Sequence, residues 1–272
     1  MKKLLAAILA ATTMLALFTG CNPASKQSVE KIKESGELVM YTNAEFPPFE
    51  YVDGSEPIGV DIDIANEIAK DLGVKLVVQN VKFDTIIGSI QSGKGALGIA
   101  GITVNEERQK AVDFSKSYTT ATQYMIIKDD SIKNLEGLMN KKVGVQTGTT
   151  GDLLISGEVD GNTEDGYRGV LKGSSKPTGY NNALEASQDL INGRLDAVVI
   201  DKLVAESIVA SNPNKGLKAV ELVYADGSKN TEEYAIAVAK GNTSLLEQVN
   251  KTLDRLNSEG KIKEFILNHT TK

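Results

Sequence analysis

Short apolar runs alternate with longer segments of helical spacing along the chain from about residue 36 onwards. Apolar runs of this length, bounded by glycine or polar positions, predict buried strands. The strands expected in this way are 37–42, 75–79, 96–101, 124–128, 142–146, 195–200 and 234–239.

The segments between these strands carry apolar residues at helical spacing. In "DIDIANEIAKDLG" (61–73), Ile64, Ile68 and Leu72 share one face, and Gly73 is typical of a helix end. In 83–93 we expect Asp84 to be the N-cap. Strands that alternate with helices predict an α/β fold with mostly parallel sheets. Further helices are expected at 181–194, 201–211 and 243–260.

The first twenty residues have the pattern of an export signal. A basic start at Lys2 and Lys3 precedes an apolar run that is too short for the ~20 residues of a membrane-spanning helix. Cys21, the only cysteine, follows "LFTG", which looks like the lipobox of bacterial lipoproteins. We therefore expect a signal peptide at 1–20 and a lipidated Cys21 with a tether at 21–35. An ordinary signal peptide with a chance cysteine is the alternative.

The charge balance excludes several classes of function. Residues 1–20 hold two lysines and no acids, so 28 basic residues then face 36 acidic ones, a net charge of −8. A nucleic-acid partner is not expected, because phosphates need basic patches. His269 is the only histidine and there is no second cysteine, so neither a metal nor a cofactor is expected. About 250 residues usually form two domains.

The segment "AGITVNEER" (100–108) carries the first candidate binding group. It follows an expected strand, and ligands bind at the carboxyl ends of strands in open α/β sheets. Asn105 can cap a helix that begins at Glu106, which places Arg108 on its first turn beside the hydroxyl and amide of Thr103. An arginine there can receive a carboxylate in a bidentate manner. A surface arginine paired with Glu106 or Glu107 is the alternative.

Three other segments supply candidate groups. "VGVQTGTTGD" (143–152) brings Thr149 and Thr150 to a helix start, where amides can bind an anion; it lacks the lysine of a P-loop, so a nucleotide is not expected. Asp201 ends a strand and can pair with an ammonium, cap the next helix, or do both. Phe46 and Phe83 are candidates for a ligand wall or for the core.

Six motifs in order and spacing resemble the bacterial extracellular solute-binding proteins for polar amino acids (family 3), which serve ABC importers. The resemblance covers about residues 36 to 268. Its motifs are "TNAEFPPFEY", "GVDIDIANEIAKDLG", "GITVNEERQKAVDFSKSY", "VGVQTGTTGD", "DAVVIDK" and "EYAIAVAKGN".

The resemblance implies a two-lobe periplasmic-binding-protein fold (Venus-flytrap, type II) with two crossover hinge strands. It implies lobe 1 at 36–117 plus 235–272, lobe 2 at 123–229, and hinges at 118–122 and 230–234. The segment 157–178 is expected to be a long surface loop.

The resemblance also assigns roles to the candidate residues. Arg108 corresponds to the clamp of the ligand α-carboxylate, with Thr103, Thr149 and Thr150 assisting. Asp201 and the Gly101 carbonyl correspond to the receptors of the α-ammonium. The remaining assignments are Phe46 and Phe83 to the sandwich around the ligand side chain, and Asn43 and Gln146 to its tip.

We therefore expect a monomeric, membrane-anchored substrate-binding lipoprotein on the outer face of the cell membrane. It would capture a free polar L-amino acid, glutamine-like or arginine/lysine-like, for ABC permease subunits. A surface sensor without transport and a dehydratase-like enzyme on the same fold are the alternatives. The absence of a histidine from the expected cleft argues against an enzyme.

Overall fold

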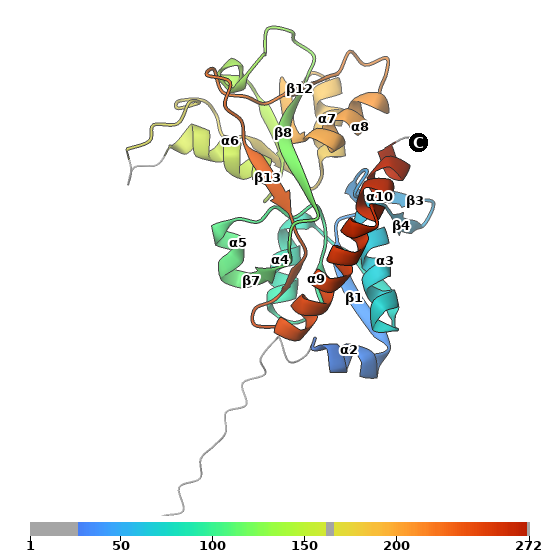
Figure 1. The fold of residues 1–272 in the computed structure, drawn as a ribbon. Helices are drawn as coiled ribbons and strands as arrows, with labels where there is room; N and C mark the ends of the chain where they lie inside the picture. The colour runs from blue at the N-terminus through green and yellow to red at the C-terminus, as the bar shows by residue number, and fades with distance from the viewer. Residues whose placement is uncertain (1–26, 162–165, 271–272) are drawn as a thin grey trace, which may run out of the picture.

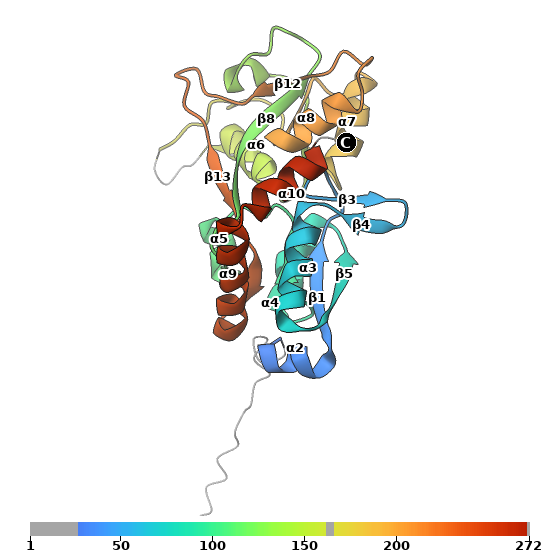
Figure 2. The ribbon, with the colours of Figure 1, turned by 45° about the vertical axis from the view of Figure 1, so that its right-hand side comes forward.

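The computed structural model describes residues 27–161 and 166–270, in which two large sheets form two lobes (Figures 1 and 2). In the sheet of the first lobe, β1 is parallel to both β5 and β6, whereas β14 is antiparallel to β6 and β7. The strand order is β5 (Lys75–Asn80), β1 (Glu37–Thr42), β6 (Leu97–Gly98), β14 (Ala237–Ala239) and β7 (Val112–Phe114).

Helices cover the first sheet because their apolar faces need a partner. Ile64 and Ile68 of α3 are fully buried, as their helical spacing predicts. Ile86 and Ile90 of α4 are buried with Ala100 and Ile102 in a separate cluster. The helices of this lobe are α2 (Val29–Ser35), α3 (Val60–Leu72), α4 (Ile86–Gln91), α5 (Glu106–Ala111), α9 (Thr243–Ser258) and α10 (Lys261–Thr270).

The second lobe has its own sheet, above the first lobe in Figure 1, and one core cluster lies wholly within it. Here β9 is parallel to β10 and β11, and β8 is antiparallel to β11 and β12. The order is β10 (Thr178–Tyr180), β9 (Val143–Gln146), β11 (Ala197–Asp201), β8 (Thr119–Ile127) and β12 (Lys218–Glu221). Its helices are α6 (Thr150–Asp160), α7 (Ala183–Ile191) and α8 (Lys202–Ala210).

Two antiparallel strands run between the lobes. The long strand β8 leaves the first lobe, and β13 (Thr231–Tyr234) returns to it while pairing with the start of β8. Tyr234 also forms a bridge with Thr103, so β13 lies directly beside the segment that follows β6. A small antiparallel sheet follows β1 and comprises β2 (Glu45–Phe46), β3 (Glu50–Asp53) and β4 (Glu56–Ile58).

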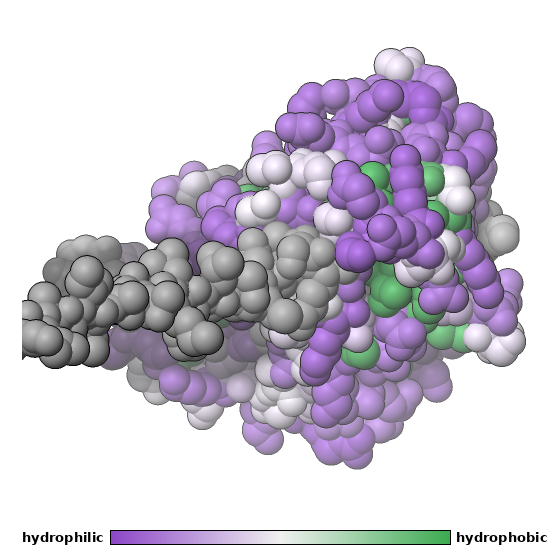
Figure 3. Space-filling view, turned by 90° about the horizontal axis from the view of Figure 1, so that it is seen from below, coloured by the Kyte–Doolittle hydropathy of each residue, from purple (hydrophilic) through white to green (hydrophobic). Residues whose placement is uncertain are grey.

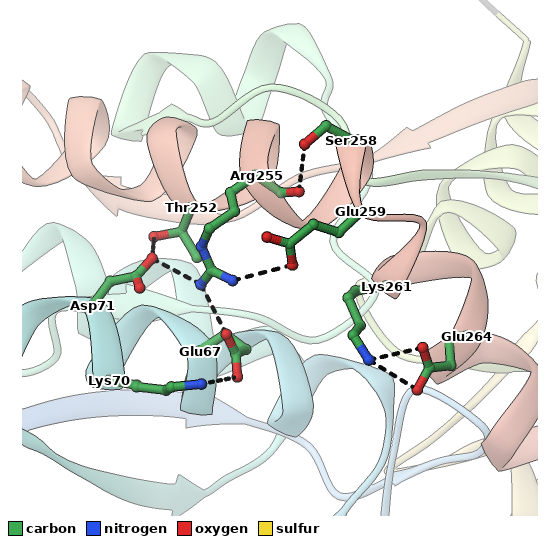
Figure 4. Close-up of polar contacts among 9 residues, drawn as sticks. All are labelled: Glu67, Lys70, Asp71, Thr252, Arg255, Ser258, Glu259, Lys261 and Glu264. Carbon is green, nitrogen blue, oxygen red and sulfur yellow. Dashed lines mark hydrogen bonds and ion pairs between the residues drawn. The ribbon is translucent and has the colours of Figure 1, made fainter.

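A charged network joins the C-terminal part of the chain to the first lobe. Figure 4 shows Arg255 of α9 between Glu67 and Asp71 of α3, with distances of 2.8 and 2.9 Å. Thr252 donates a further hydrogen bond to Asp71 at 2.8 Å. This network holds α9 against α3 beside their shared apolar contact.

Three sequence predictions are corrected by the structure. Asp84 is not an N-cap: it lies inside a 3-10 turn (Phe83–Thr85), and α4 begins only at Ile86. The strand expected at 96–101 shortens to Leu97–Gly98, and Gly101, with φ of 54°, turns the chain beyond its end. The loop expected at 157–178 begins later, since α6 continues to Asp160.

The surface agrees with an acidic, polar chain. The face seen from below is mostly hydrophilic, with hydrophobic residues in small groups (Figure 3). In the described residues, no helix has both the length and the apolar character needed to cross a bilayer. The predicted signal peptide and Cys21 lie outside the described residues.

Candidate functional site

Arg108 is positioned by the cap of α5. The Asn105 side chain accepts a hydrogen bond from the Arg108 backbone N–H at 2.8 Å, so the predicted cap is confirmed. A capped first turn fixes where the Arg108 side chain leaves the helix. Because Thr103 lies just ahead of this cap, both residues face the same space.

Arg108 is a buried cation that is held by carbonyl groups. Its side chain donates to Thr103 O at 2.7 Å and to Gly148 O at 3.0 Å, and its guanidinium lies 5.4 Å from the Phe83 ring centroid. Only 8% of the residue is exposed, and no ion pair to a carboxylate is found for it among the described residues. The predicted surface alternative is therefore wrong. Burial lowers the pKa of Arg108, and the charges of Glu232 and Asp201 oppose that shift.

Asp201 lies at the carboxyl end of β11 and is 5% exposed. Its Oδ1 accepts hydrogen bonds from Tyr234 Oη at 2.6 Å and from Gln123 Nε2 at 3.1 Å. It occupies the N-cap position of α8 without forming a side-chain cap, so the capping alternative is wrong. Burial, followed by the charge of Glu232, raises the pKa of Asp201 to about 7.

Hydrogen bonds between the lobes meet at this site. Thr150 of α6 donates to the Thr103 hydroxyl at 3.0 Å, and Gln146 Nε2 donates to Asn43 Oδ1 at 2.9 Å. Thr149 caps α6 by accepting from the Asp152 N–H and donates to Gln146 O. The two threonines therefore lie at the helix N-terminus where the sequence predicts an anion-binding turn.

The predicted residues surround a very small cavity of about 10 Å³. Gly101 is required there, because its φ is 54° and a Cβ would lie 2.8 Å from the Phe46 ring. Eight of the ten predicted ligand residues line the cavity, and the remaining two, Asn43 and Gln146, are joined by the hydrogen bond described above. The lining residues are Phe46, Phe83, Gly101, Thr103, Arg108, Thr149, Thr150 and Asp201.

A buried pair of carboxyl groups supports the floor of the cavity. Asp61 Oδ2 accepts from the Gly101 N–H at 2.9 Å and from Tyr118 Oη at 3.0 Å. Burial raises the pKa of Asp61 to about 6, and burial beside Asp61 raises the pKa of Glu50 well above its usual value. Glu50 lies beside Asp61, and Asp61 holds the Gly101 backbone in place.

Sequence reasoning missed three residues of this site. Gln123 on β8 and Glu232 and Tyr234 on β13 are buried against Thr103 or Asp201. The signal was present in "TEEY", because period-two alternation places Glu232 and Tyr234 on one face. That face could be recognised as buried only once β13 was known to pair with β8.

The arrangement suits a small zwitterion. A buried cation and a buried carboxylate line one cavity, and burial strengthens the attraction of each for an opposite charge. Among the described residues no group of three or more histidine, cysteine, aspartate or glutamate side chains could hold a metal ion. Fold and site thus define the class of two-lobe α/β proteins that bind a small charged solute.

Comparison with known proteins agrees with this class. The family model of the bacterial extracellular solute-binding proteins, family 3, matches residues 38–271. The arginine-binding extracellular protein ArtP of Bacillus subtilis is 32% identical, over 97% of this chain and 96% of ArtP.

Two solved structures show the same fold. An ancestral arginine-binding protein bound to arginine has a TM-score of 0.75 at 42% identity, covering 86% of this chain and 98% of that one. An ancestral arginine-binding protein bound to glutamine has a TM-score of 0.75 at 40% identity, covering 87% and 99%.

The chain belongs to the bacterial extracellular solute-binding proteins, family 3. It is therefore an extracytoplasmic binding protein, and its homologues are non-enzymatic. The predicted family and two-lobe fold are confirmed.

Proposed function

We propose that this protein captures L-arginine or, with lower affinity, L-glutamine between its lobes and delivers it to an ABC permease. The observation that carries the proposal is Arg108, a cation only 8% exposed that lines one cavity with the buried carboxylate Asp201. Arg108, Thr103, Thr149 and Thr150 would receive the α-carboxylate. Asp201 and the Gly101 carbonyl would receive the α-ammonium.

The side-chain end of the ligand would meet Asn43 and Gln146. Gln146 Nε2 is used by Asn43, whereas Gln146 Oε1 is buried and has no hydrogen-bond partner among the described residues. A guanidinium or carboxamide N–H of the ligand would satisfy this acceptor, and a buried acceptor without a partner costs about 1–3 kcal/mol. Phe46 and Phe83 would contact the aliphatic part of the ligand.

Arginine is favoured over glutamine by the surrounding charge. Asp201, Glu232 and Asp61 are buried acids near the cavity, whereas Arg108 is the basic residue that lines it. A cationic side chain would offset part of the surplus negative charge. The name of ArtP and the arginine-bound ancestral protein support the same choice.

Delivery would use closure of the two lobes about the crossover strands. We place the hinges at 118–122 and 230–234, lobe 1 at 36–117 plus 235–272, and lobe 2 at 123–229. A ligand that contacts both lobes stabilises the closed arrangement, because only differential contact shifts the population. The permease would recognise the closed form.

We further propose that Cys21 carries a lipid that anchors the protein to the outer face of the cell membrane. The sequence "LFTGC" and the polar tether after it support this anchor. In cells that express Cys21→Ser, the protein should appear in the medium or the soluble extracytoplasmic fraction. Retention of the variant in the membrane would contradict the anchor without affecting the ligand proposal.

Titration calorimetry of the purified protein against the common L-amino acids tests the ligand. We expect arginine to bind most tightly and Arg108→Ala to abolish the signal, because truncation leaves the ligand carboxylate buried without a partner. Arg194→Ala is the matched control, since Arg194 is an exposed arginine that pairs with Asp189. If the wild-type protein gives no heat of binding with any of these amino acids, the proposal of amino-acid binding is contradicted.

Uptake separates transport from sensing. Cells that lack this protein should import labelled arginine more slowly, and restoring the wild-type protein should restore import. A protein that binds arginine in vitro while its deletion leaves import unchanged would instead act as a sensor.

A further inference from the structure

Glu232 is a buried carboxylate on a strand that otherwise alternates between solvent and interior. It is 5% exposed, whereas its neighbours Thr231 and Glu233 on β13 are exposed. β13 pairs with β8 in a register that sets Glu232 opposite Ala121. The strand therefore directs one of two adjacent glutamates toward the ligand cavity.

The Glu232 carboxylate accepts hydrogen bonds from Thr103, which lines the cavity, and from Gln123, which is bonded to the lining residue Asp201. Thr103 Oγ1 donates to Oε2 at 2.5 Å, and Gln123 Nε2 donates to Oε1 at 2.8 Å. Gln123 Nε2 also donates to Asp201 Oδ1 at 3.1 Å. At the other end, the Thr103 hydroxyl accepts from Thr150 across the lobes. A continuous chain of hydrogen bonds thus runs from Thr150 to Asp201 with Glu232 at its centre.

We infer that Glu232 is a ligand-positioning residue that ties both ends of the amino-acid site to the crossover strand β13. It holds the Thr103 hydroxyl at the carboxylate-receiving end, and it holds Gln123 beside the ammonium-receiving Asp201. The inference rests on the proposed function. It adds a residue that would act on the ligand through Thr103 and Gln123.

The role follows from the hydrogen-bond acceptor that Thr103 and Gln123 would each lose without Glu232. The Thr103 hydroxyl needs an acceptor to point its lone pairs toward Thr150 and the cavity, and Glu232 provides it. A glutamine at 232 has only one acceptor atom. If its amide oxygen accepts from Gln123 Nε2, its amide nitrogen faces Thr103 as a donor and the Thr103 hydroxyl loses its acceptor; if the amide is reversed, Gln123 Nε2 loses its acceptor. Glu232→Gln keeps the size of the side chain and removes its charge, yet Thr103 or Gln123 would no longer be held in its orientation.

The charge of Glu232 also sets the pH range of binding. The charged and titratable groups around Asp201 are Glu232 and Tyr234 from β13, Arg108 from α5 and Glu50 from β3. Burial and Glu232 raise the pKa of Asp201 to about 7. An ammonium prefers the ionised carboxylate, so affinity should rise with pH through about 7. Removal of the charge at 232 lowers the pKa of Asp201 and should shift this rise to lower pH.

The test is titration calorimetry of the full chain with L-arginine from about pH 6 to about pH 8, a range that brackets the pKa of Asp201. Glu232→Gln should bind about tenfold more weakly at the upper pH, the loss of one hydrogen bond to a charged group. The midpoint of its affinity–pH curve should lie below that of the wild-type protein. Glu233→Gln, the exposed neighbour on the same strand, should match the wild type in both measurements.

The shift in the pH curve separates positioning from a merely structural role, which would lower affinity without moving the midpoint. Wild-type affinity together with a wild-type pH curve in Glu232→Gln would overturn the inference. If Glu232→Gln does not fold, Gln123→Met removes the link from the other strand, and unchanged affinity there would overturn it equally. Absence of arginine binding by both wild type and Glu233→Gln would instead defeat the proposed function.

Discussion

Gln146 of β9 donates a hydrogen bond to Asn43 at 2.9 Å, and this contact joins the lobes beside the ligand cavity. Asn43 in turn donates to Val81 O at 2.8 Å, so its amide is oriented from both sides. Because a carbonyl faces Asn43 Nδ2, its Oδ1 faces Gln146. Gln146 is thereby fixed with its own Oε1 directed elsewhere and without a partner among the described residues.

Gln146→Leu should weaken binding of arginine by roughly tenfold while leaving the clamp intact. The change removes the acceptor for a ligand N–H, and hydrogen bonds to charged groups contribute about 1.5–3 kcal/mol. Calorimetry with arginine and glutamine measures the loss, and Arg108→Ala provides the reference for complete loss. Equal affinities of Gln146→Leu and wild type would show that the ligand tip lies elsewhere.

Asp61 and Asp201 should make the ligand-free protein less stable as pH rises from about 4 to about 7. Both groups keep a proton in the folded state to about pH 6 and about pH 7, whereas an unfolded aspartate loses its proton near pH 4. Unfolding in this window therefore releases protons, so stability falls with rising pH. Thermal unfolding at stepped pH measures the trend.

The stabilisation of the protein by bound arginine should have the opposite pH dependence and increase with rising pH. The ligand binds the ionised Asp201, so the rise in melting temperature that it causes should grow between about pH 6 and about pH 8. Asp201→Asn should reduce the pH dependence of the ligand-free protein, leaving the part due to Asp61, and should lose most of the stabilisation by arginine. A ligand effect that declines over this range would contradict the assignment of Asp201 to the ammonium.

Local patterns accounted for the part of the site that depends on neighbouring residues. The spacing of α3 and the cap at Asn105 are encoded within a few positions, and Arg108 follows from that cap. Asp201 was found because it ends an apolar strand. In each case the chemistry of a short segment determines where the side chain points.

The rest depends on contacts between distant segments. Thr103 and Glu232 are 129 residues apart in sequence, and Gln123 and Asp201 are 78 apart, so neither pairing is visible in local spacing. Asp84 shows the converse error. It has the residue type of a cap, but Lys82 takes that position at the start of the 3-10 turn and Asp84 lies within the turn. Residue type alone therefore does not determine which position caps the start of the turn.

Arg255→Ala should lower stability without changing arginine affinity, because Arg255 joins α9 to α3 away from the cavity (Figure 4). The side chain is one-third exposed, so we expect a loss of about 1 kcal/mol and a fall in melting temperature of roughly 2–4 °C. Lys261→Ala, which removes an exposed pair with Glu264, is the control and should change little. A large loss of affinity in Arg255→Ala would mean that this network acts on closure.

Glu158 should anchor the segment that follows α6. The carboxylate is 5% exposed and accepts from Tyr167 Oη at 2.6 Å, Tyr224 Oη at 2.7 Å and the Val170 N–H at 2.8 Å. The bond to Glu158 raises the pKa of Tyr167 to about 12, as expected for a phenol that donates to a carboxylate. Gly169 lies so close that a Cβ would sit 2.2 Å from Glu158 O.

Glu158→Gln should therefore lower the free energy of unfolding by about 1–2 kcal/mol, because an amide accepts fewer of these hydrogen bonds and carries no charge. Amide exchange at 166–171 should accelerate in the variant, while exchange in the first lobe stays unchanged. Asp160 lies on the same helix as Glu158 and forms an exposed ion pair with Lys176. Asp160→Asn removes this pair and should change neither the free energy of unfolding nor the amide exchange by much. If Glu158→Gln and Asp160→Asn exchange alike at these amides, the tyrosine contacts do not hold the segment, and packing of Leu171 against the second core would have to do so.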